Sequence, residues 1–205
     1  MTPEPPRPLL SQRAEQRLGP RHREVLDELE ALFFADGFAG RSVRELAAHV
    51  GCSRRTLYEL APSKDDLVLI VLDRFLHRVG RAALDQIDTE APFTDQVARY
   101  ILGAAELQRL THVFSEDLAD EPAARRLFDR HFEYVTAVTE GIVRRGIAAG
   151  EFRDVPPAVV AGALAASAAH FSQSGFLVEA GLDYDTAVAT LVDLVTRSLA
   201  TRERA

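Results

Sequence analysis

The sequence is poor in residues that form cross-links or hold metal ions. Its 205 residues include one cysteine, Cys52, so neither an intramolecular disulfide nor a multi-cysteine zinc site can form within one chain. The six histidines fall into no HExxH pattern, and no glycine-rich loop of the phosphate-cradling kind is present. The sequence therefore predicts no metal site, no cofactor and no catalytic residues, and we do not expect an enzyme.

Long apolar runs are also missing. The longest run of small apolar residues, 155–169, contains two prolines and is too short to span a bilayer. Residues 1–20 contain five prolines and no continuous apolar stretch, which is not the pattern of a secretory signal. Together with the single cysteine, these features lead us to expect a cytoplasmic protein without a membrane partner.

Residues with high helix propensity make up much of the chain. Ala, Leu, Arg and Glu recur throughout, and polar and apolar residues do not alternate over strand-like lengths. The sequence therefore predicts an all-α fold. Caps, prolines and apolar periodicity place helices at about 21–35, 43–50, 54–60, 64–87, 94–110, 112–118, 122–148, 157–179 and 184–201. Residues 1–20 lack this periodicity and are interpreted as a disordered basic arm.

Charge is distributed unevenly along the chain. The whole sequence carries a formal net charge of -7. Residues 76–205 contribute 13 basic and 19 acidic side chains, whereas residues 41–64 contribute five basic and two acidic ones, a local net charge of +3. Local charge matters more than total charge for contact with phosphates. The acidic total therefore does not exclude a nucleic-acid partner at residues 41–64.

Residues 42–61 have the pattern of a helix-turn-helix. Ser42 and Glu45 form a capping box at the start of one short helix, and Ser53 caps a second short helix after a glycine-containing turn. A longer amphipathic helix at about 21–35 precedes the pair. This is the arrangement of motifs whose second short helix enters the major groove of DNA.

The apolar residues of the two short helices are spaced to face a small core. They are Val43, Leu46, Ala47, Val50, Leu57 and Leu60. The outward positions carry side chains that contact guanine edges, thymine methyl groups and phosphates. They are Arg44, Arg54, Arg55, Thr56 and Tyr58. An Arg-Arg pair also fits a solvated helix surface, but its place after a capped helix and a turn favours DNA contact.

These motifs resemble the DNA-binding domain of the TetR family of regulators. The resemblance covers the segment from Val25 to Leu72. Its motifs are LFFADGF at 32–38, SVRELA at 42–47, VGCS at 50–53, TLY at 56–58 and PSKDDL at 62–67. The resemblance implies a helix-turn-helix DNA-binding domain at 21–81. It also implies a larger helical domain at 82–205 for ligand binding and dimerisation.

The resemblance gives individual residues their expected roles. It implies that phosphates are contacted by the residues at three positions, which are Arg44, Tyr58 and Lys64 here. It implies that base edges are read by the residues at three other positions, which are Arg54, Arg55 and Thr56. Two positions depart from the family pattern, because Leu60 and Ala61 replace a His or Tyr and a Phe. We hypothesise that Phe34, where a small residue is usual, fills part of the space beside Ala61.

The last helix carries an apolar stripe. The stripe consists of Val188, Leu191, Val192, Val195 and Leu199, and the preceding helix is rich in residues that permit close helix packing. In the family, the last two helices pair with those of a second subunit. We therefore interpret the stripe as the interface of a homodimer, with an intrachain core as the alternative. Reading two DNA half-sites requires such two-fold symmetry.

The resemblance further implies a pocket for a small-molecule effector. Aromatic and histidine side chains suited to such a pocket are Phe75, Tyr100, His112, His131, Tyr134 and His170. The overall prediction is a transcriptional repressor that binds a palindromic operator in double-stranded DNA and is released by a small, largely apolar effector. The alternative is a helical protein-interaction module without specific DNA binding.

Overall fold

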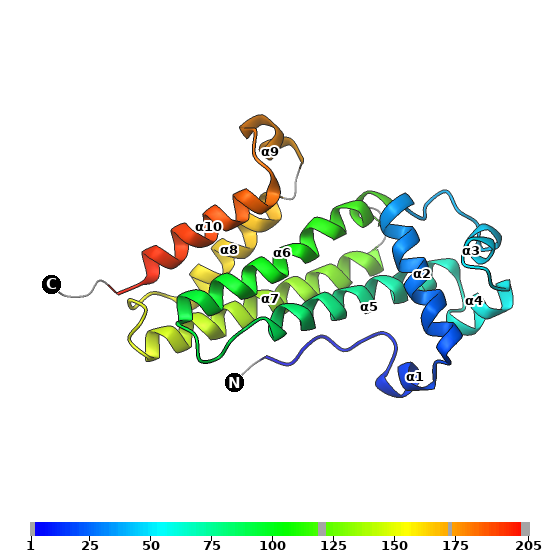
Figure 1. Cartoon of the computed structure of the whole chain (residues 1–205), viewed down its shortest axis with the longest axis horizontal. Coiled ribbons are helices and arrows are strands. Elements are labelled where there is room, and N and C mark those ends of the chain that lie inside the picture. Colours follow the sequence, from blue (N-terminus) through cyan, green and yellow to red (C-terminus); the bar gives the residue numbers. More distant parts are fainter. Residues whose placement is uncertain (1–2, 119–121, 172–173, 202–205) are drawn as a thin grey trace. The chain divides into compact units, whose positions relative to one another are not determined.

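The computed structural model describes residues 3–118, 122–171 and 174–201 of the chain. Within these ranges the regular elements are helices, and no strand is present beyond one bridge between Phe152 and Ala200. The helices, labelled in Figure 1, are α1 (Gln12–Arg17), α2 (Pro20–Asp36), α3 (Val43–His49), α4 (Arg54–Leu60), α5 (Lys64–Asp85), α6 (Phe93–Leu118), α7 (Pro122–Ala148), α8 (Pro157–Phe171), α9 (Ser174–Ala180) and α10 (Tyr184–Leu199). The predicted all-α fold is confirmed. No helix in the described ranges has both the length and the apolar content needed to cross a membrane.

The chain divides into two compact units. The N-terminal unit contains residues 7–78 and 110–129, and the C-terminal unit contains residues 1–6, 79–109 and 130–205. The sequence had placed residues 110–129 in the larger C-terminal domain, whereas they cluster with the N-terminal unit. The helix-turn-helix therefore lies wholly in the N-terminal unit, and α8 to α10 lie wholly in the C-terminal unit.

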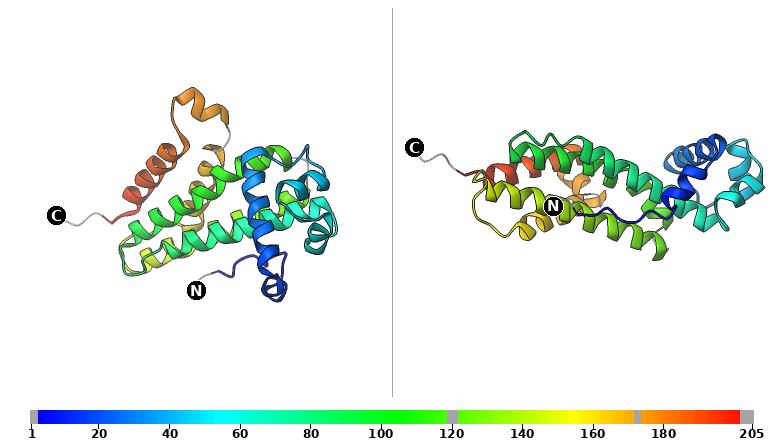
Figure 2. Two further views of the ribbon diagram at one scale, coloured as in Figure 1. Left: turned by 45° about the vertical axis from the view of Figure 1, so that its right-hand side comes forward. Right: turned by 90° about the horizontal axis from the view of Figure 1, so that it is seen from below.

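The N-terminal unit is built around the apolar face of α2. The buried residues on that face are Val25, Leu26, Leu29, Leu32 and Phe33. The helix starts with Pro20, which suits a first helical position, and is followed by Gly37 with a φ of 69°. Leu46 of α3 and Leu57 of α4 bury their side chains in the same unit. The views in Figures 1 and 2 agree that α3 and α4 lie beside α2.

The C-terminal unit has its own core. Tyr100 of α6, Leu164 of α8 and Val188 of α10 are at most 1% exposed and belong to one hydrophobic cluster. Phe152, in the turn after α7, belongs to the same cluster and packs directly on Gly146. The backbone N–H of Phe152 also donates to the Gly146 carbonyl at 3.1 Å. Gly146 thus lets the chain fold back closely at the end of α7.

The structure differs from the disordered arm predicted at residues 1–20. From residue 3 onward the segment is described, and it contains α1. The Leu9 N–H donates to the Asp73 carboxylate at 2.7 Å, and Arg74 donates to Glu15 at 3.1 Å. These contacts join residues 59 and 64 positions apart. Local composition carries no signal for contacts of this kind.

Two other predicted helices have different boundaries. The sequence suggested separate helices at 94–110 and 112–118, but α6 runs unbroken from Phe93 to Leu118. Neither proline nor glycine lies between residues 104 and 118, so no breaker ends the helix near residue 110. The helix predicted at 157–179 is α8, which ends at Phe171, and a short α9. Gly175, a weak helix former, lies in the first turn of α9.

Candidate nucleic-acid interface

The start of α3 is fixed by the predicted capping box. The Ser42 hydroxyl accepts from the Glu45 N–H at 3.3 Å, and the Glu45 carboxylate accepts from the Ser42 N–H at 2.8 Å. These bonds satisfy backbone donors that a helix start leaves unpaired. They also hold the pKa of the Glu45 carboxyl below its usual range. The capping box explains how a helix as short as α3 keeps a defined first residue.

The turn between α3 and α4 is tight. Gly51 adopts a φ of 58°, a left-handed conformation that favours glycine. The Cys52 N–H donates to the Ala47 carbonyl at 2.9 Å, which closes the turn. The Ser53 hydroxyl then accepts from the Thr56 N–H at 3.1 Å and caps α4. The turn and the cap together fix the direction in which α4 leaves α3.

Arg21 of α2 holds this turn from behind. Its guanidinium donates to the backbone carbonyls of Val50 and Gly51. It also pairs with Glu24 and Glu28 of its own helix, at 3.2 and 3.3 Å. Arg21 thereby satisfies carbonyls at the end of α3 and connects α2 to the turn. No local sequence pattern indicates this role, because the two carbonyls lie about 30 residues away.

The exposed side of α4 carries the side chains that were predicted to contact DNA. Arg54 and Arg55 are exposed, and Tyr58 is 55% exposed. Leu57 and Leu60 point the other way and are 2% and 8% exposed. The helix therefore separates its apolar side from a side rich in hydrogen-bond donors, as groove binding requires.

The remaining predicted contacts surround α4. Arg44 of α3 is exposed, and Thr56 is partly exposed with its hydroxyl 2.9 Å from that of Ser53. The Lys64 ammonium at the start of α5 donates to the Ala39 carbonyl at 3.2 Å. These side chains belong to one unit and share its surface with α4.

Glu59 is a charged residue of α4 that the sequence analysis missed. Its carboxylate accepts from Arg55 Nε at 3.0 Å, and His22 Nε2 of α2 lies 3.4 Å from its other oxygen. The hydrogen bond from Arg55, followed by the contact with His22, lowers the pKa of the Glu59 carboxyl. The four-residue spacing between Arg55 and Glu59 indicates their contact in the sequence itself. No such spacing indicates the contact between Glu59 and His22 of α2.

The two departures from the family pattern lie in the core. Leu60 and Ala61 are 8% and 3% exposed, so both side chains pack inward. The ring of Phe34 lies 4.5 Å from that of Phe75, centroid to centroid. Phe34 thus packs against α5, which accounts for a large residue at that position. Whether it also compensates for Ala61 stays a hypothesis.

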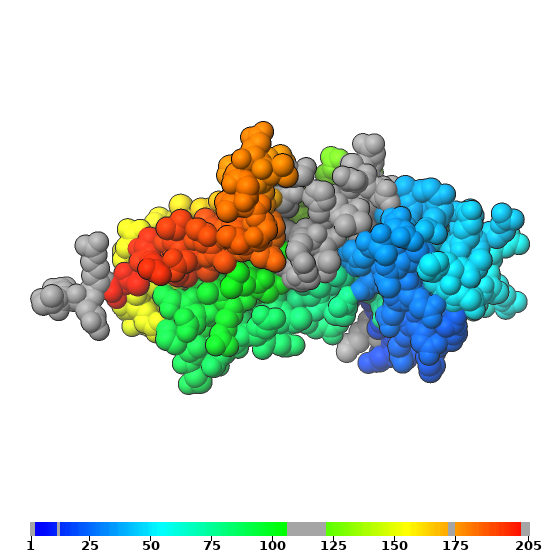
Figure 3. Space-filling model, turned by 45° about the horizontal axis from the view of Figure 1, so that its top comes forward, coloured from blue at the N-terminus to red at the C-terminus, as the bar shows by residue number. Residues whose placement is uncertain are grey.

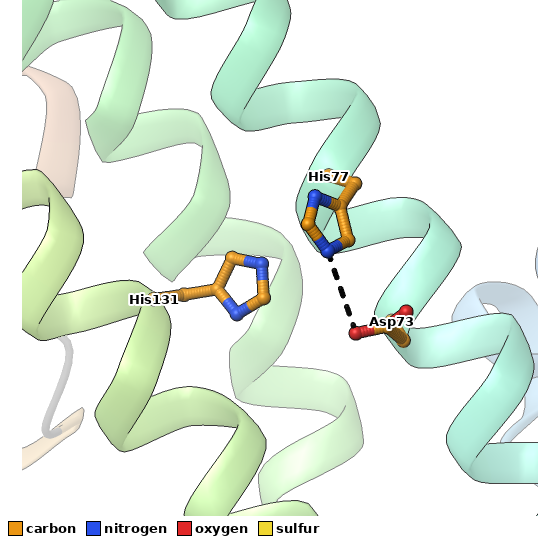
Figure 4. Close-up of side chains that lie close together, drawn as sticks. All are labelled: Asp73, His77 and His131. Atoms are coloured by element: carbon orange, nitrogen blue, oxygen red, sulfur yellow. Dashed lines mark ion pairs between the residues drawn. The ribbon is translucent and has the colours of Figure 1, made fainter. Parts of the chain in front are cut away.

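Within the N-terminal unit, polar contacts tie α5 to α2 and to the N-terminal segment. Asp73 is 1% exposed, and Figure 4 shows its ion pair with His77, with 3.7 Å between Oδ1 and Nε2. Arg74 reaches Asp27 of α2 at 3.2 Å. Arg78 pairs with Glu30 of α2, where burial raises the pKa of the carboxyl. Arg74 and Arg78, one turn apart on α5, therefore tie this part of the helix to α2.

Several predicted effector residues are core residues. Phe75 is 1% exposed and packs within the N-terminal unit. Tyr100 and Tyr134, on α6 and α7, belong to the core of the C-terminal unit, where burial raises the pKa of both phenols. The nearby Tyr134 adds to the shift at Tyr100. The structure thus brings these two tyrosines together inside the C-terminal unit.

The three predicted histidines have different environments. His131 of α7 is 4% exposed. His170 lies on the exposed side of α8, with its ring 5.2 Å from that of Phe176. His112 belongs to α6, but its side chain lies outside the part of the structure that is described. His170 is therefore a surface residue in one chain, which does not suit an enclosed pocket.

The apolar stripe of α10 faces the core of its own chain. Val188, Val192 and Leu199 are at most 3% exposed, and Leu191 and Val195 pack partly buried against the same cluster. Val188, Val192 and Leu199 therefore belong to the intrachain core, the alternative, whereas an interface role of Leu191 and Val195 stays a prediction. Amphipathic spacing identifies a buried face but does not say which chain buries it.

The other sides of α8 to α10 expose apolar and small residues. Val159 of α8, Val178 of α9 and Leu194 of α10 are 66%, 78% and 62% exposed. Ala163 and Ala166 lie exposed on the same helix as Val159. Figure 3 shows α9 and α10 at the molecular surface, and α8 packs against both. We call these five residues the C-terminal apolar surface. Val159, Ala163 and Ala166 share one face of α8 by their spacing, and exposed apolar faces occur at interaction sites.

Comparison with family models gives two matches. Residues 25–71 match the model of bacterial regulatory proteins of the tetR family, and residues 118–192 match a tetracyclin repressor-like C-terminal domain. The first match contains the whole helix-turn-helix, and the second contains α7, α8 and α9 with half of α10. No curated protein matches the chain.

Solved structures share the fold. A regulator from Saccharomonospora viridis in complex with choline is 21% identical, with a TM-score of 0.73 over 88% of this chain and 98% of its own. A TetR regulator from Haloarcula marismortui is 17% identical, with a TM-score of 0.73 over 88% and 98%. Reduced NemR from E. coli is 16% identical, with a TM-score of 0.73 over 91% and 100%. At such identities the likeness shows the fold.

Proposed function

Because this chain belongs to the TetR family of bacterial regulatory proteins, we propose that it is a homodimeric repressor with a palindromic operator and a small, largely apolar effector. The family makes it a transcription regulator with a helix-turn-helix DNA-binding domain, not an enzyme. Beyond family membership, the proposal states that the protein represses transcription, that its DNA site is a palindrome, that it is a homodimer and that its ligand is a small, largely apolar molecule.

The proposal rests chiefly on the exposed side of α4. It presents Arg54, Arg55 and Tyr58 while its apolar residues are buried. The bases are assigned to Arg54, Arg55 and Thr56, and the phosphates to Arg44, Tyr58 and Lys64. Arginine grips a guanine edge with two hydrogen bonds, and tyrosine and lysine donate to phosphate oxygens. This cluster gives an otherwise acidic protein a local positive surface, which the negative phosphates of DNA require.

A dimer is supported by the C-terminal apolar surface. Val159 and Leu194 expose more than half of their surface in the single chain, and the exposed Ala163 and Ala166 of α8 allow helices of two subunits to approach closely. A two-fold interface places the same residues on both sides. Two α4 helices then read the two halves of a palindrome.

Effector binding is assigned to the C-terminal unit. Tyr100 and Tyr134 place two phenol groups in its mostly apolar core, a composition that suits a small organic ligand. A structural relative binds choline, which makes choline one compound to test first. Release follows if the ligand prefers a conformation in which the two α4 helices have the wrong spacing for the operator. The ligand shifts the population only by its difference in affinity for the two conformations.

The test is a titration of the DNA upstream of the protein's own gene. Binding is measured against a scrambled duplex, over a range of salt, with and without choline and apolar compounds. We expect tighter binding to the upstream DNA, weakening with salt, and release by one compound class. Equal binding to both duplexes at every salt concentration would favour the protein-interaction alternative.

A further inference from the structure

Glu59 places a negative charge on the helix to which the proposed function assigns base reading. Its side chain is 48% exposed, four residues after Arg55. A carboxylate close to DNA phosphates repels them and weakens binding to any sequence. A surface ion pair by itself adds little to folding stability. Neither folding nor general affinity for DNA therefore accounts for an acidic residue at this place.

One oxygen of Glu59 fixes the orientation of Arg55. Arg55 Nε donates to Glu59 Oε1 at 3.0 Å, while 88% of the Arg55 side chain remains exposed. Because this hydrogen bond uses Nε, the two terminal Nη groups of the guanidinium can still donate to DNA. A guanine edge offers two acceptors, O6 and N7, which a planar fork of this kind matches.

The other oxygen of Glu59 connects to α2. His22 Nε2 lies 3.4 Å from Oε2, and only 29% of the His22 side chain is exposed. The preceding residue, Arg21, donates to the carbonyls at the turn before α4. Glu59 is thus hydrogen-bonded to Arg55 on one side and lies close to His22 of α2 on the other. A long, flexible arginine side chain loses conformational entropy when it binds DNA. The hydrogen bond to Glu59 restrains Arg55 beforehand and so reduces that loss.

We propose that Glu59 is a specificity-determining positioning residue that holds the Arg55 guanidinium ready for a guanine edge. It acts through Arg55 and does not itself contact a base. The inference rests on the proposed role of Arg55 in reading DNA. It gives Glu59 opposite effects on two kinds of DNA, because it improves the one base contact while it repels every phosphate backbone.

The experiment uses the full chain and two duplexes. One is enriched from a random pool by wild-type binding, and the other is a scrambled duplex of the same length and composition. The variants are Glu59→Ala, Glu59→Gln, Arg55→Ala and the double alanine variant. Asp65→Asn is the matched control, because Asp65 is an exposed acid of the same unit whose described contacts include no ion pair with Arg55. Circular dichroism checks that each variant folds.

We expect Glu59→Ala to lower the ratio of enriched to scrambled affinity about tenfold, within the range of about 5-fold to 150-fold that one bidentate base contact provides. Its affinity for the scrambled duplex rises. Glu59→Gln keeps an oxygen that accepts from Nε, so the loss is smaller. Asp65→Asn changes both affinities alike. In the Arg55→Ala background, Glu59→Ala lowers the ratio no further.

Two results overturn the inference alone. In the first, Arg55→Ala loses specificity but Glu59→Ala leaves the ratio of enriched to scrambled affinity unchanged. In the second, Glu59→Ala lowers that ratio equally in the wild-type and in the Arg55→Ala background. If wild-type protein enriches no duplex, or Arg55→Ala leaves the ratio unchanged, the proposed reading role of Arg55 fails and the inference fails with it. The two failures are therefore distinguishable in one set of titrations.

Discussion

The close packing of Gly146 against Phe152 makes a sharp prediction about stability. A Cβ added at Gly146 would lie 2.4 Å from Cδ2 and 2.7 Å from Cε2 of the Phe152 ring. Carbon atoms in contact normally lie about 3.5–4.0 Å apart, so the methyl group of Gly146→Ala overlaps the ring by about 1 Å. Phe152 is 2% exposed and has Phe93 beside it. Its ring therefore has little room to move away.

The size of the effect follows from two opposing contributions. Overpacking of a core costs about 1–3 kcal/mol. Replacement of glycine by alanine in a helix returns at most about 1 kcal/mol, and less at the end of α7. We expect a net loss of about 1–2 kcal/mol, which lowers the melting temperature of a chain of this size by about 2–8 °C.

The assay is thermal and urea unfolding followed by circular dichroism. Gly141→Ala is the matched control on the same helix, because a Cβ there meets only the end of the Arg145 side chain, at 3.7 Å. That variant should be as stable as the wild type or slightly more stable. The packing argument is wrong if Gly146→Ala unfolds at the same temperature as Gly141→Ala.

Three further predictions concern the cap, the core and the interface. Ser42→Ala should lower stability by about 1 kcal/mol through loss of the α3 cap. The hydrogen bonds from Ser42 hold the pKa of Glu45 below its usual range, so its contribution is present at neutral pH and is lost as the pH falls through the folded-state pKa. Urea unfolding from neutral to acidic pH should therefore show a flatter acid response in Glu45→Gln, which lacks the titrating carboxyl, and an unaltered response would reject the capping argument. Phe34→Ala should lower stability by about 1–3 kcal/mol, because the ring packs on Phe75, and an unchanged melting temperature would exclude that packing role. Leu194→Asp should give a folded monomer in analytical ultracentrifugation, and a persistent dimer would remove Leu194 from the interface.

The sequence was sufficient where the contacts are local. The Ser42 capping box and the Ser53 cap join residues three positions apart, so their spacing is visible in the sequence itself. The buried pattern of α3 and α4 follows from the same short periodicity. Together these signals placed the helix-turn-helix and its exposed arginines correctly.

The sequence was insufficient where contacts join distant segments. Arg21 holds a turn 29 residues away, and Leu9 reaches Asp73 across 64. Neither pair has a local pattern, and both shape the unit that carries α4. The stripe around Val192 shows a second kind of limit, because periodicity marks a buried face without naming the chain that covers it.

The most direct test of base reading by α4 compares Arg54→Ala with Lys64→Ala. Binding of each variant to the enriched and the scrambled duplex is measured over a range of salt. Arg54→Ala should cost about 1–3 kcal/mol on the enriched duplex only. Lys64→Ala should weaken both duplexes alike and reduce the salt slope by about 1. Equal losses on both duplexes from both variants would contradict the account.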